Sequence, residues 1–113
     1  MVGPILGGPT NSYHIGAGVT KDYAEAVKWY RKAADQGDAR GQSELGNCYA
    51  SGQGVTEEKE TGYMWYLLAE ARGIDHARQV IEYIEKKLTP EQRLNGQKRA
   101  REWQAAFDKA KGN

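Results

Sequence analysis

The segment GAGVT at residues 16–20 returns almost unchanged as GQGVT at residues 52–56, which is 36 residues further along the chain. Beyond these segments, identical residues recur at the same spacing: Trp29 and Trp65, Tyr30 and Tyr66, Ala33 and Ala69, Gly37 and Gly73. A fixed period of about 20 to 50 residues is typical of stacked repeats, in which each unit buries its apolar face against its neighbours. The sequence therefore predicts a repeat protein that presents a surface for binding. In a regular stack, Trp29 and Trp65 would have equivalent surroundings.

The first copy predicts a helical hairpin. Apolar residues between about Asp22 and Gln36 are spaced by one or three positions, as on one face of an amphipathic helix. Asp22 is placed to cap the first turn with Glu25 as its reciprocal partner, and Gly37 supplies a left-handed exit. A second helix is expected to start after Asp38. The residues of this helix that we expect to face inward are Ala39, Gln42, Leu45, Gly46 and Tyr49.

The second copy predicts the same pair of helices, at about residues 57–72 and 75–88. We expect one inserted residue before Asp75, which then takes the capping position of the second helix. A glycine inside a helix costs about 1 kcal/mol relative to alanine, so Gly46 and Gly62 indicate close contacts between helices. The second helix of this copy carries an apolar stripe formed by Ala77, Val80, Ile81, Ile84 and Leu88.

The C-terminal part predicts one long helix. The segment TPEQ at residues 89–92 is a strong helix start, with Thr89 as the cap and Gln92 at the capping-box position. Small and aromatic residues then form one narrow apolar seam at Gly96, Ala100, Trp103, Phe107 and Ala110. We expect this helix to cover the second repeat.

A longer pattern of glycine, alanine, polar and aromatic positions runs through the first copy. Its members are Gly16, Gly18, Val19, Asp22, Ala26, Trp29, Tyr30, Lys32, Ala33, Ala34, Gly37, Asp38, Gln42, Leu45, Gly46 and Tyr49. This pattern resembles the Sel-one-like repeat, a relative of the tetratricopeptide repeat, over roughly residues 13–88. The second copy departs from it at Thr61, Gly62 and Glu70. The resemblance implies an α/α superhelix that mediates contacts between proteins, in a family that is often bacterial and has no general catalytic residues.

The expected fold is all-α: a short solenoid of two helical-hairpin repeats with a long C-terminal capping helix. Its four parts are an irregular N-terminal segment with the remnant of a preceding repeat (1–15), a first repeat (16–51), a degenerate second repeat (52–88) and the capping helix (89–113). Repeat stacks usually contain at least three units, whereas this chain has about two. Self-association could complete the burial, so a homodimer is one expected partnership.

Composition indicates one small domain without a strong electric field. The chain has 113 residues, and its 16 Lys and Arg nearly balance its 15 Asp and Glu, so neither nucleic acid nor an anionic membrane is an expected partner. No apolar run approaches the roughly 20 residues that span a bilayer. The first nine residues lack the basic region of a signal peptide, so we expect a cytoplasmic protein, with export left open.

No residues converge on a catalytic or metal site in the sequence, so we expect no cofactor, no metal and no enzyme activity. His14 and His76 are 62 residues apart, and zinc needs three or four convergent ligands. Cys48 is the single cysteine and has no identifiable base beside it. The resemblance leaves one alternative, an enzyme or enzyme-associated domain acting on cell-wall peptides or β-lactams, because the family includes proteins once reported with such activity. The chain has no Ser-x-x-Lys pair to support it.

The surface that we expect to bind a protein or peptide lies on the second helix of each repeat, which usually lines the concave side of a solenoid. The candidate residues are Arg40, Ser43, Glu44, Asn47, Gln79, Glu82, Tyr83 and Lys86. Tyr83 is the best anchor, because tyrosine combines apolar area with a polar tip. The alternative is that Tyr83 covers the C-terminal helix.

Overall fold

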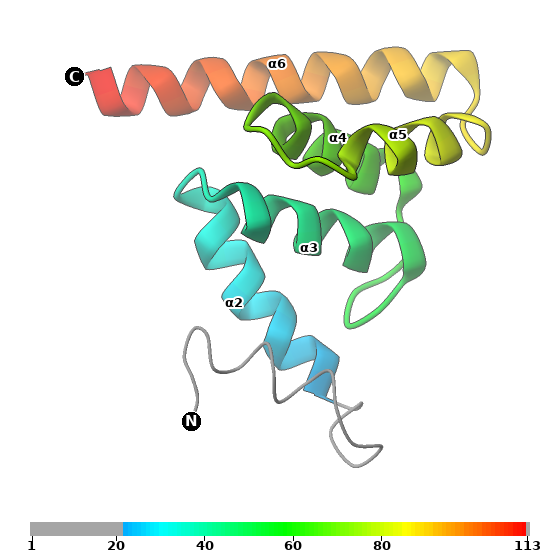
Figure 1. Cartoon of the computed structure of the whole chain (residues 1–113), viewed down its shortest axis with the longest axis horizontal. Coiled ribbons are helices and arrows are strands. Elements are labelled where there is room, and N and C mark those ends of the chain that lie inside the picture. Colours follow the sequence, from blue (N-terminus) through cyan, green and yellow to red (C-terminus); the bar gives the residue numbers. More distant parts are fainter. Residues whose placement is uncertain (1–21, 113) are drawn as a thin grey trace.

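A computed structural model describes residues 22–112, which form a succession of helices (Figure 1). The helices are α2 (Tyr23–Asp35), α3 (Ala39–Ser51), α4 (Lys59–Ala71), α5 (Ala77–Glu85) and α6 (Pro90–Gly112). The described part contains no strand, so the predicted all-α fold with a long C-terminal helix is confirmed. The predicted N-terminal segment and the glycine loop at 16–20 lie outside the described residues.

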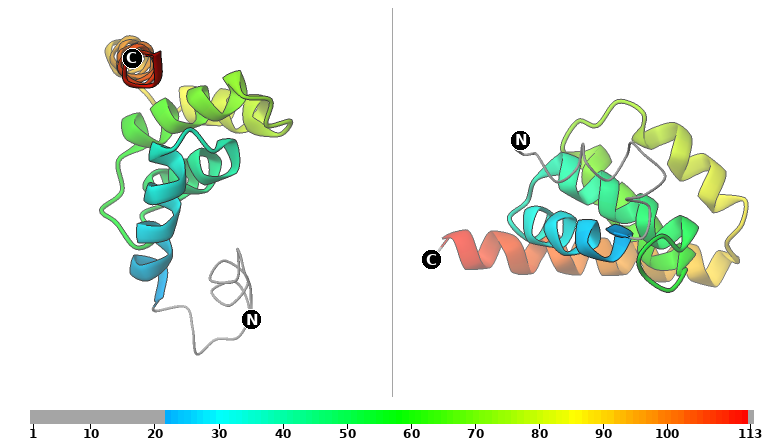
Figure 2. Two further views of the ribbon diagram at one scale, coloured as in Figure 1. Left: turned by 90° about the vertical axis from the view of Figure 1, so that its left-hand side faces the viewer. Right: turned by 90° about the horizontal axis from the view of Figure 1, so that it is seen from below.

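Helix α4 is the centre of the molecule. It contacts α3, α5 and α6, whereas α2 packs on α3 (Figure 2). The six consecutive residues from Thr61 to Tyr66 are all buried, so α4 is covered on every side. A helix that is buried all round belongs inside a fold, whereas a surface helix keeps one polar face. The second repeat therefore supplies the central helix of the described part, on which α3, α5 and α6 pack directly.

The core consists of two clusters that both include residues of α4. The first joins α2, α3, α4 and α6, and its largest side chains are Val27, Tyr30, Leu45, Met64, Trp65 and Leu68. The second joins α4 and α5 and continues to Leu88, with Tyr63, Tyr66, Ile81 and Ile84 as its other large members. Because each cluster contains side chains from neighbouring hairpins, burial in this fold depends on stacking.

Helices α3 and α4 cross closely through two glycines, as predicted. A Cβ atom at Gly62 would stand 2.8 Å from the carbonyl oxygen of Gly46 and 2.9 Å from the amide nitrogen of Ala50. A Cβ atom at Gly46 would stand 2.9 Å from the ring of Tyr66. The space for a side chain is occupied by the opposing helix, and this contact explains both glycines.

Three of the predicted helix ends are confirmed. The Asp38 carboxylate accepts a hydrogen bond of 2.7 Å from the amide of Gly41 and caps α3. Gly37, at the end of α2, has a φ of 85°, a left-handed conformation that favours glycine. At the start of α6, the backbone N–H of Thr89 donates a hydrogen bond of 2.9 Å to the side-chain oxygen of Gln92. The backbone N–H of Gln92 donates one of 3.1 Å to the Thr89 hydroxyl. This is the predicted capping box.

Two predicted caps and the predicted insertion are wrong. Asp22 makes no side-chain cap bond, and the residue at the N-cap of α5 is His76 and not Asp75. The buried positions of α3 recur in α5 at the unbroken spacing of 36, as shown by the pairs Gly41 and Ala77, Leu45 and Ile81, Cys48 and Ile84. Contact with α4 therefore sets the alignment of the two helices, and α5 begins later in its repeat than α3 does.

The two equivalent tryptophans have different surroundings, which corrects the expectation of a regular stack. Trp29 on α2 is 46% exposed, whereas Trp65 on α4 is 4% exposed. The ring of Trp103 on α6 meets Trp65 edge-on, with ring centroids 5.7 Å apart. Helix α6 thus covers the second repeat, as predicted.

The apolar seam of α6 is confirmed for four of its five residues. Gly96 and Ala100 are buried, and Trp103 and Phe107 are half-buried. Ala110 is exposed, so the prediction was wrong for this residue. Figure 1 gives the reason, because α6 runs past the other helices at its C-terminal end.

Candidate functional site

Helices α3 and α5 lie side by side and run in the same direction on α4. Near their N-terminal ends, the Ser43 hydroxyl and His76 Nε2 are 3.4 Å apart. Near their C-terminal ends, Asn47 and Tyr83 line one groove. The second helices of the two repeats therefore form a shared surface.

The groove between α3 and α5 has a volume of about 340 Å³, and we call it the α3–α5 groove. Its lining residues are Asn47, Ala50 and Ser51 of α3, Glu57, Lys59 of α4, Val80, Tyr83 and Ile84 of α5, and Lys87. Ile84 is buried and Val80 is half-buried, so they form an apolar floor, while Tyr83 is 61% exposed beside them. Tyr83 thus borders a groove against α3. The alternative, in which Tyr83 covers α6, does not fit this position, because Tyr83 lines the groove beside α3 and is largely exposed.

The other predicted site residues are not among those that line this groove. Arg40, Gln79, Glu82 and Lys86 are exposed but do not line it. Glu44 is half-buried, and its negative charge adds to the effect of burial in raising the pKa of Tyr66 to about 12. The structure brings together Asn47 and Tyr83 from the predicted set.

Ser43 was wrongly predicted to face outward. It is 5% exposed, and its hydroxyl lies between His76 and the buried Tyr66. The pattern of α3 alone could not reveal this burial, because Ser43 is covered by Tyr66 of α4 and by His76 at the start of α5. At the true spacing of 36, Ser43 corresponds to Gln79, which is exposed because α5 has no further repeat packed beside it in the described part of the chain.

Sequence reasoning missed seven of the nine lining residues: Ala50, Ser51, Glu57, Lys59, Val80, Ile84 and Lys87. Val80 and Ile84 were assigned to the inward stripe, and they also form the floor of the groove, where Val80 is half-buried and Ile84 is buried. Lys87 follows Tyr83 by four residues, a spacing that places two side chains on one helix face and could have identified it. Lys59 comes from α4, and no pattern in the sequence links it to α5.

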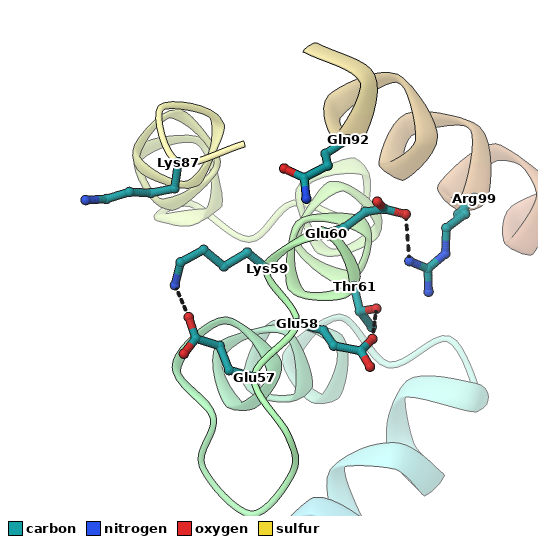
Figure 3. A pocket seen from close by; sticks show the side chains of 8 residues that line it. All are labelled: Glu57, Glu58, Lys59, Glu60, Thr61, Lys87, Gln92 and Arg99. Carbon is teal, nitrogen blue, oxygen red and sulfur yellow. Dashed lines mark hydrogen bonds and ion pairs between the residues drawn. The ribbon is translucent and has the colours of Figure 1, made fainter. Parts of the chain in front are cut away.

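A second, polar pocket of about 490 Å³ adjoins the groove at the start of α4 (Figure 3). Its carboxylates already have partners within the pocket. Arg99 lies 3.1 Å from Glu60, the Thr61 hydroxyl donates a bond of 2.7 Å to Glu58, and Lys59 pairs with Glu57. These contacts hold the start of α4 to its neighbours. The acidic cluster is therefore explained by internal pairing.

Cys48 lies in the first core cluster and is 3% exposed. Burial, with a smaller contribution from the charge of Glu44, raises the pKa of its thiol to about 11. Only the thiolate is a nucleophile, so this cysteine is protonated at neutral pH. Among residues 22–112, no three His, Cys, Asp or Glu side chains are grouped so that they could hold a metal ion. His14 lies outside this range.

We expect the Cys48 thiol to resist a disulfide reagent in the folded protein at about pH 8, where an ordinary thiol is partly ionised. The reaction should become fast once urea unfolds the chain, because the pKa then returns to its usual range. Absorbance of the released thiolate during reaction with an aromatic disulfide measures both rates. Fast, complete reaction of the folded protein would contradict the buried position.

None of the helices in the described part of the chain is long and apolar enough to cross a lipid bilayer.

Comparison with known proteins gives two findings. The sequence pattern of the Sel1 repeat matches residues 6–38 and 39–74 of this chain. A protein of Rhizobium meliloti (strain 1021), described as "Exopolysaccharide production negative regulator", is 29% identical over 101 residues. The similarity covers 74% of this chain and 38% of that protein, so the chain spans less than half the length of this relative. The family pattern begins its second unit at α3 and includes the close α3–α4 crossing, whereas the sequence-based division places a boundary between these helices.

Proposed function

Since this chain belongs to the Sel1 repeat family, we propose that it is a non-catalytic adaptor that docks another protein or peptide on the joint surface of α3 and α5. Repeats of this family form scaffolds for contacts between proteins, and the matched units cover more than half of the chain. The observation that supports this particular surface is the α3–α5 groove, where the exposed ring of Tyr83 stands beside an apolar floor. Exposed aromatic anchors at the edge of an apolar recess are typical of binding surfaces.

The relative from Rhizobium meliloti suggests a setting for this activity. Its description names it a negative regulator. We infer that the present chain also takes part in a regulatory assembly, in which it holds a partner without modifying it chemically.

No observation favours the hydrolase alternative. Within residues 22–112, the one contact that resembles a nucleophile with its base is between Ser43 and His76, at 3.4 Å. The Ser43 hydroxyl is buried, is also engaged by Tyr66 and lines neither of the two pockets. A substrate needs access to the nucleophile, so this pair is better explained as a link between α3 and α5.

Replacing Tyr83 by alanine should weaken partner binding by about 10-fold or more, because the main exposed aromatic surface of the groove is lost. The stability of the protein should change little, since Tyr83 is 61% exposed.

The partner is first captured from an extract of the bacterium that encodes the chain and then purified. Titration calorimetry with the purified partner gives the affinity of each variant. Trp29→Ala is the matched control, since this exposed tryptophan lies on α2, away from the groove. Undiminished binding by Tyr83→Ala together with a loss in Trp29→Ala would place the surface on α2 instead.

Self-association is a second expected partnership, and the exposure of Trp29 supports α2 as the contact. The expected result is a molar mass that rises with protein concentration in light scattering, and Trp29→Ala should suppress this rise. A monomer at every concentration would contradict it.

A further inference from the structure

We propose that the α3–α5 groove selects a segment in which an acidic side chain lies next to an aliphatic one, and that Lys87 holds the carboxylate. This inference rests on the proposed function, because it names the chemistry of the partner for the same surface. It is carried by two features of the groove: its apolar floor and the single uncompensated charge at its edge.

The floor of the groove fits aliphatic side chains. Val80 and Ile84 line it from α5, and Ala50 lines it from α3. The Tyr83 ring forms one wall. A volume of about 340 Å³ lies at the small end of the range for ligand sites, so it admits a few side chains of a segment and not a folded element. Burying an aliphatic side chain there removes apolar surface of both partners from water.

The charges at the groove leave one ammonium group without a carboxylate. Lys59 donates a bond of 3.1 Å to the Ala50 carbonyl and pairs with Glu57, so these two charges neutralise each other. Lys87 also lines the groove, but no carboxylate of residues 22–112 lies within ion-pair distance of its Nζ atom. In Figure 3 its side chain extends away from the Glu57–Lys59 pair. The α3–α5 groove therefore has one net positive charge.

The position of Lys87 relative to Tyr83 places this charge beside the apolar wall. Its Nζ atom lies 5.3 Å from the centre of the Tyr83 ring, a cation–π arrangement. A segment whose aliphatic side chain contacts Tyr83 thus brings its neighbouring side chain to the ammonium. A carboxylate there forms a charge-assisted hydrogen bond, which an amide of the same shape forms less strongly.

The carboxylate belongs to an acidic side chain within the segment and not to a chain terminus. Capture of a terminal carboxylate typically uses a nest of free backbone N–H groups. Most lining residues lie inside α3 and α5, where the N–H groups are used in the helices. The groove offers the Lys87 ammonium in place of such a nest, and a single ammonium suits the carboxylate of one acidic side chain.

The test uses short synthetic peptides capped at both ends, with the sequence Ser-Leu-Asp-Leu-Ser, and the same peptide with Asn in place of Asp. A third peptide, Ser-Leu-Ser-Leu, has a free C-terminal carboxylate and no acidic side chain. Binding to the full chain is followed by the amide resonances of the ¹⁵N-labelled protein. We expect the Asp peptide to shift the resonances of Asn47, Tyr83 and Lys87 and to bind about 5-fold more tightly than either of the others.

Two lysine variants assign the preference. Lys87→Met removes the charge and keeps an apolar stem, so the Asp and Asn peptides should then bind equally. Lys86→Met is the matched control, since Lys86 is the neighbouring exposed lysine that does not line the groove, and it should keep the 5-fold difference. Both sites are exposed, so both variants should fold as the wild type does.

The following results would overturn the inference: no shifts in the groove with any peptide, equal binding of the Asp and Asn peptides to the wild type, tightest binding of the free-carboxylate peptide, or loss of the preference in Lys86→Met. The proposed function is judged separately with the purified natural partner. If that partner requires Tyr83 but binds Lys87→Met normally, the acidic preference fails and the docking surface stands. If it requires neither residue, both proposals fail.

Discussion

Replacing Gly62 by leucine is expected to lower the free energy of unfolding by about 3 kcal/mol, which is a large part of the stability of a small domain. Leucine is a strong helix former, so the substitution favours α4 locally and the loss must come from sterics. The position of a Cβ atom at this residue is 2.8 Å from the backbone oxygen of Gly46. Backbone atoms cannot rotate away as a side chain does. Helices α3 and α4 must therefore separate, and both core clusters lose contacts.

Urea unfolding followed by circular dichroism measures this effect, and two variants calibrate it. Gly62→Ala adds only the Cβ atom and should be destabilised by less than the leucine variant. Gly112→Leu is the matched control, because a Cβ atom at Gly112, at the end of α6, would meet no atom within 4 Å. It should unfold at the same urea concentration as the wild type. Equal stability of the Gly62 and Gly112 leucine variants would mean that α3 and α4 do not cross closely.

Replacing Trp65 by alanine should cost about 4 kcal/mol, whereas the same change at Trp29 should cost less than about 1 kcal/mol. The two residues are equivalent in the repeat, yet Trp65 is 4% exposed and Trp29 is 46% exposed. Truncation of Trp65 removes a large part of the first core cluster and leaves Trp103 of α6 without its edge-on partner. Truncation of Trp29 removes a ring that is already half in water.

The comparison is internally controlled, since both variants lose the same side chain at the same position of a repeat. Thermal and urea unfolding of the two proteins give the two free energies. Trp65→Ala should also weaken the docking of α6, so faster amide hydrogen exchange is expected in this helix than in the Trp29→Ala protein. Similar losses of stability in both variants would show that the repeats have equivalent surroundings, contrary to the structure.

The helices themselves could be predicted from the sequence because their signals are local. Apolar spacing identified every helix between Tyr23 and Gly112. The ends were predictable where one side chain can reach only its own helix turn, as at Asp38 and at Thr89. The same reasoning failed at Asp75, a suitable capping residue that lies one position before His76, the actual N-cap of α5. A cap is worth about 1 kcal/mol, and burial of the α5 stripe against α4 outweighs it.

The candidate site was predictable only in outline. The repeat pattern indicated the second helix of each hairpin, and it identified Asn47 and Tyr83, both of which line the groove. It could not show that Ser43 is buried, because that depends on Tyr66 and His76 from other helices. Nor could it show that the Lys59 ammonium pairs with the Glu57 carboxylate while the Lys87 ammonium has no carboxylate partner among residues 22–112.

By itself, the sequence determined the repeat, the all-α class and the glycines at the α3–α4 crossing, because periodicity and helix propensity are properties of nearby residues. Only the tertiary structure decided which of the two equivalent tryptophans is buried and which of the two lysines of the groove has a carboxylate partner. Burial depends on what a distant segment places beside a residue. For the tryptophans that segment is α6, whose Trp103 packs edge-on against Trp65, while Trp29 is left 46% exposed.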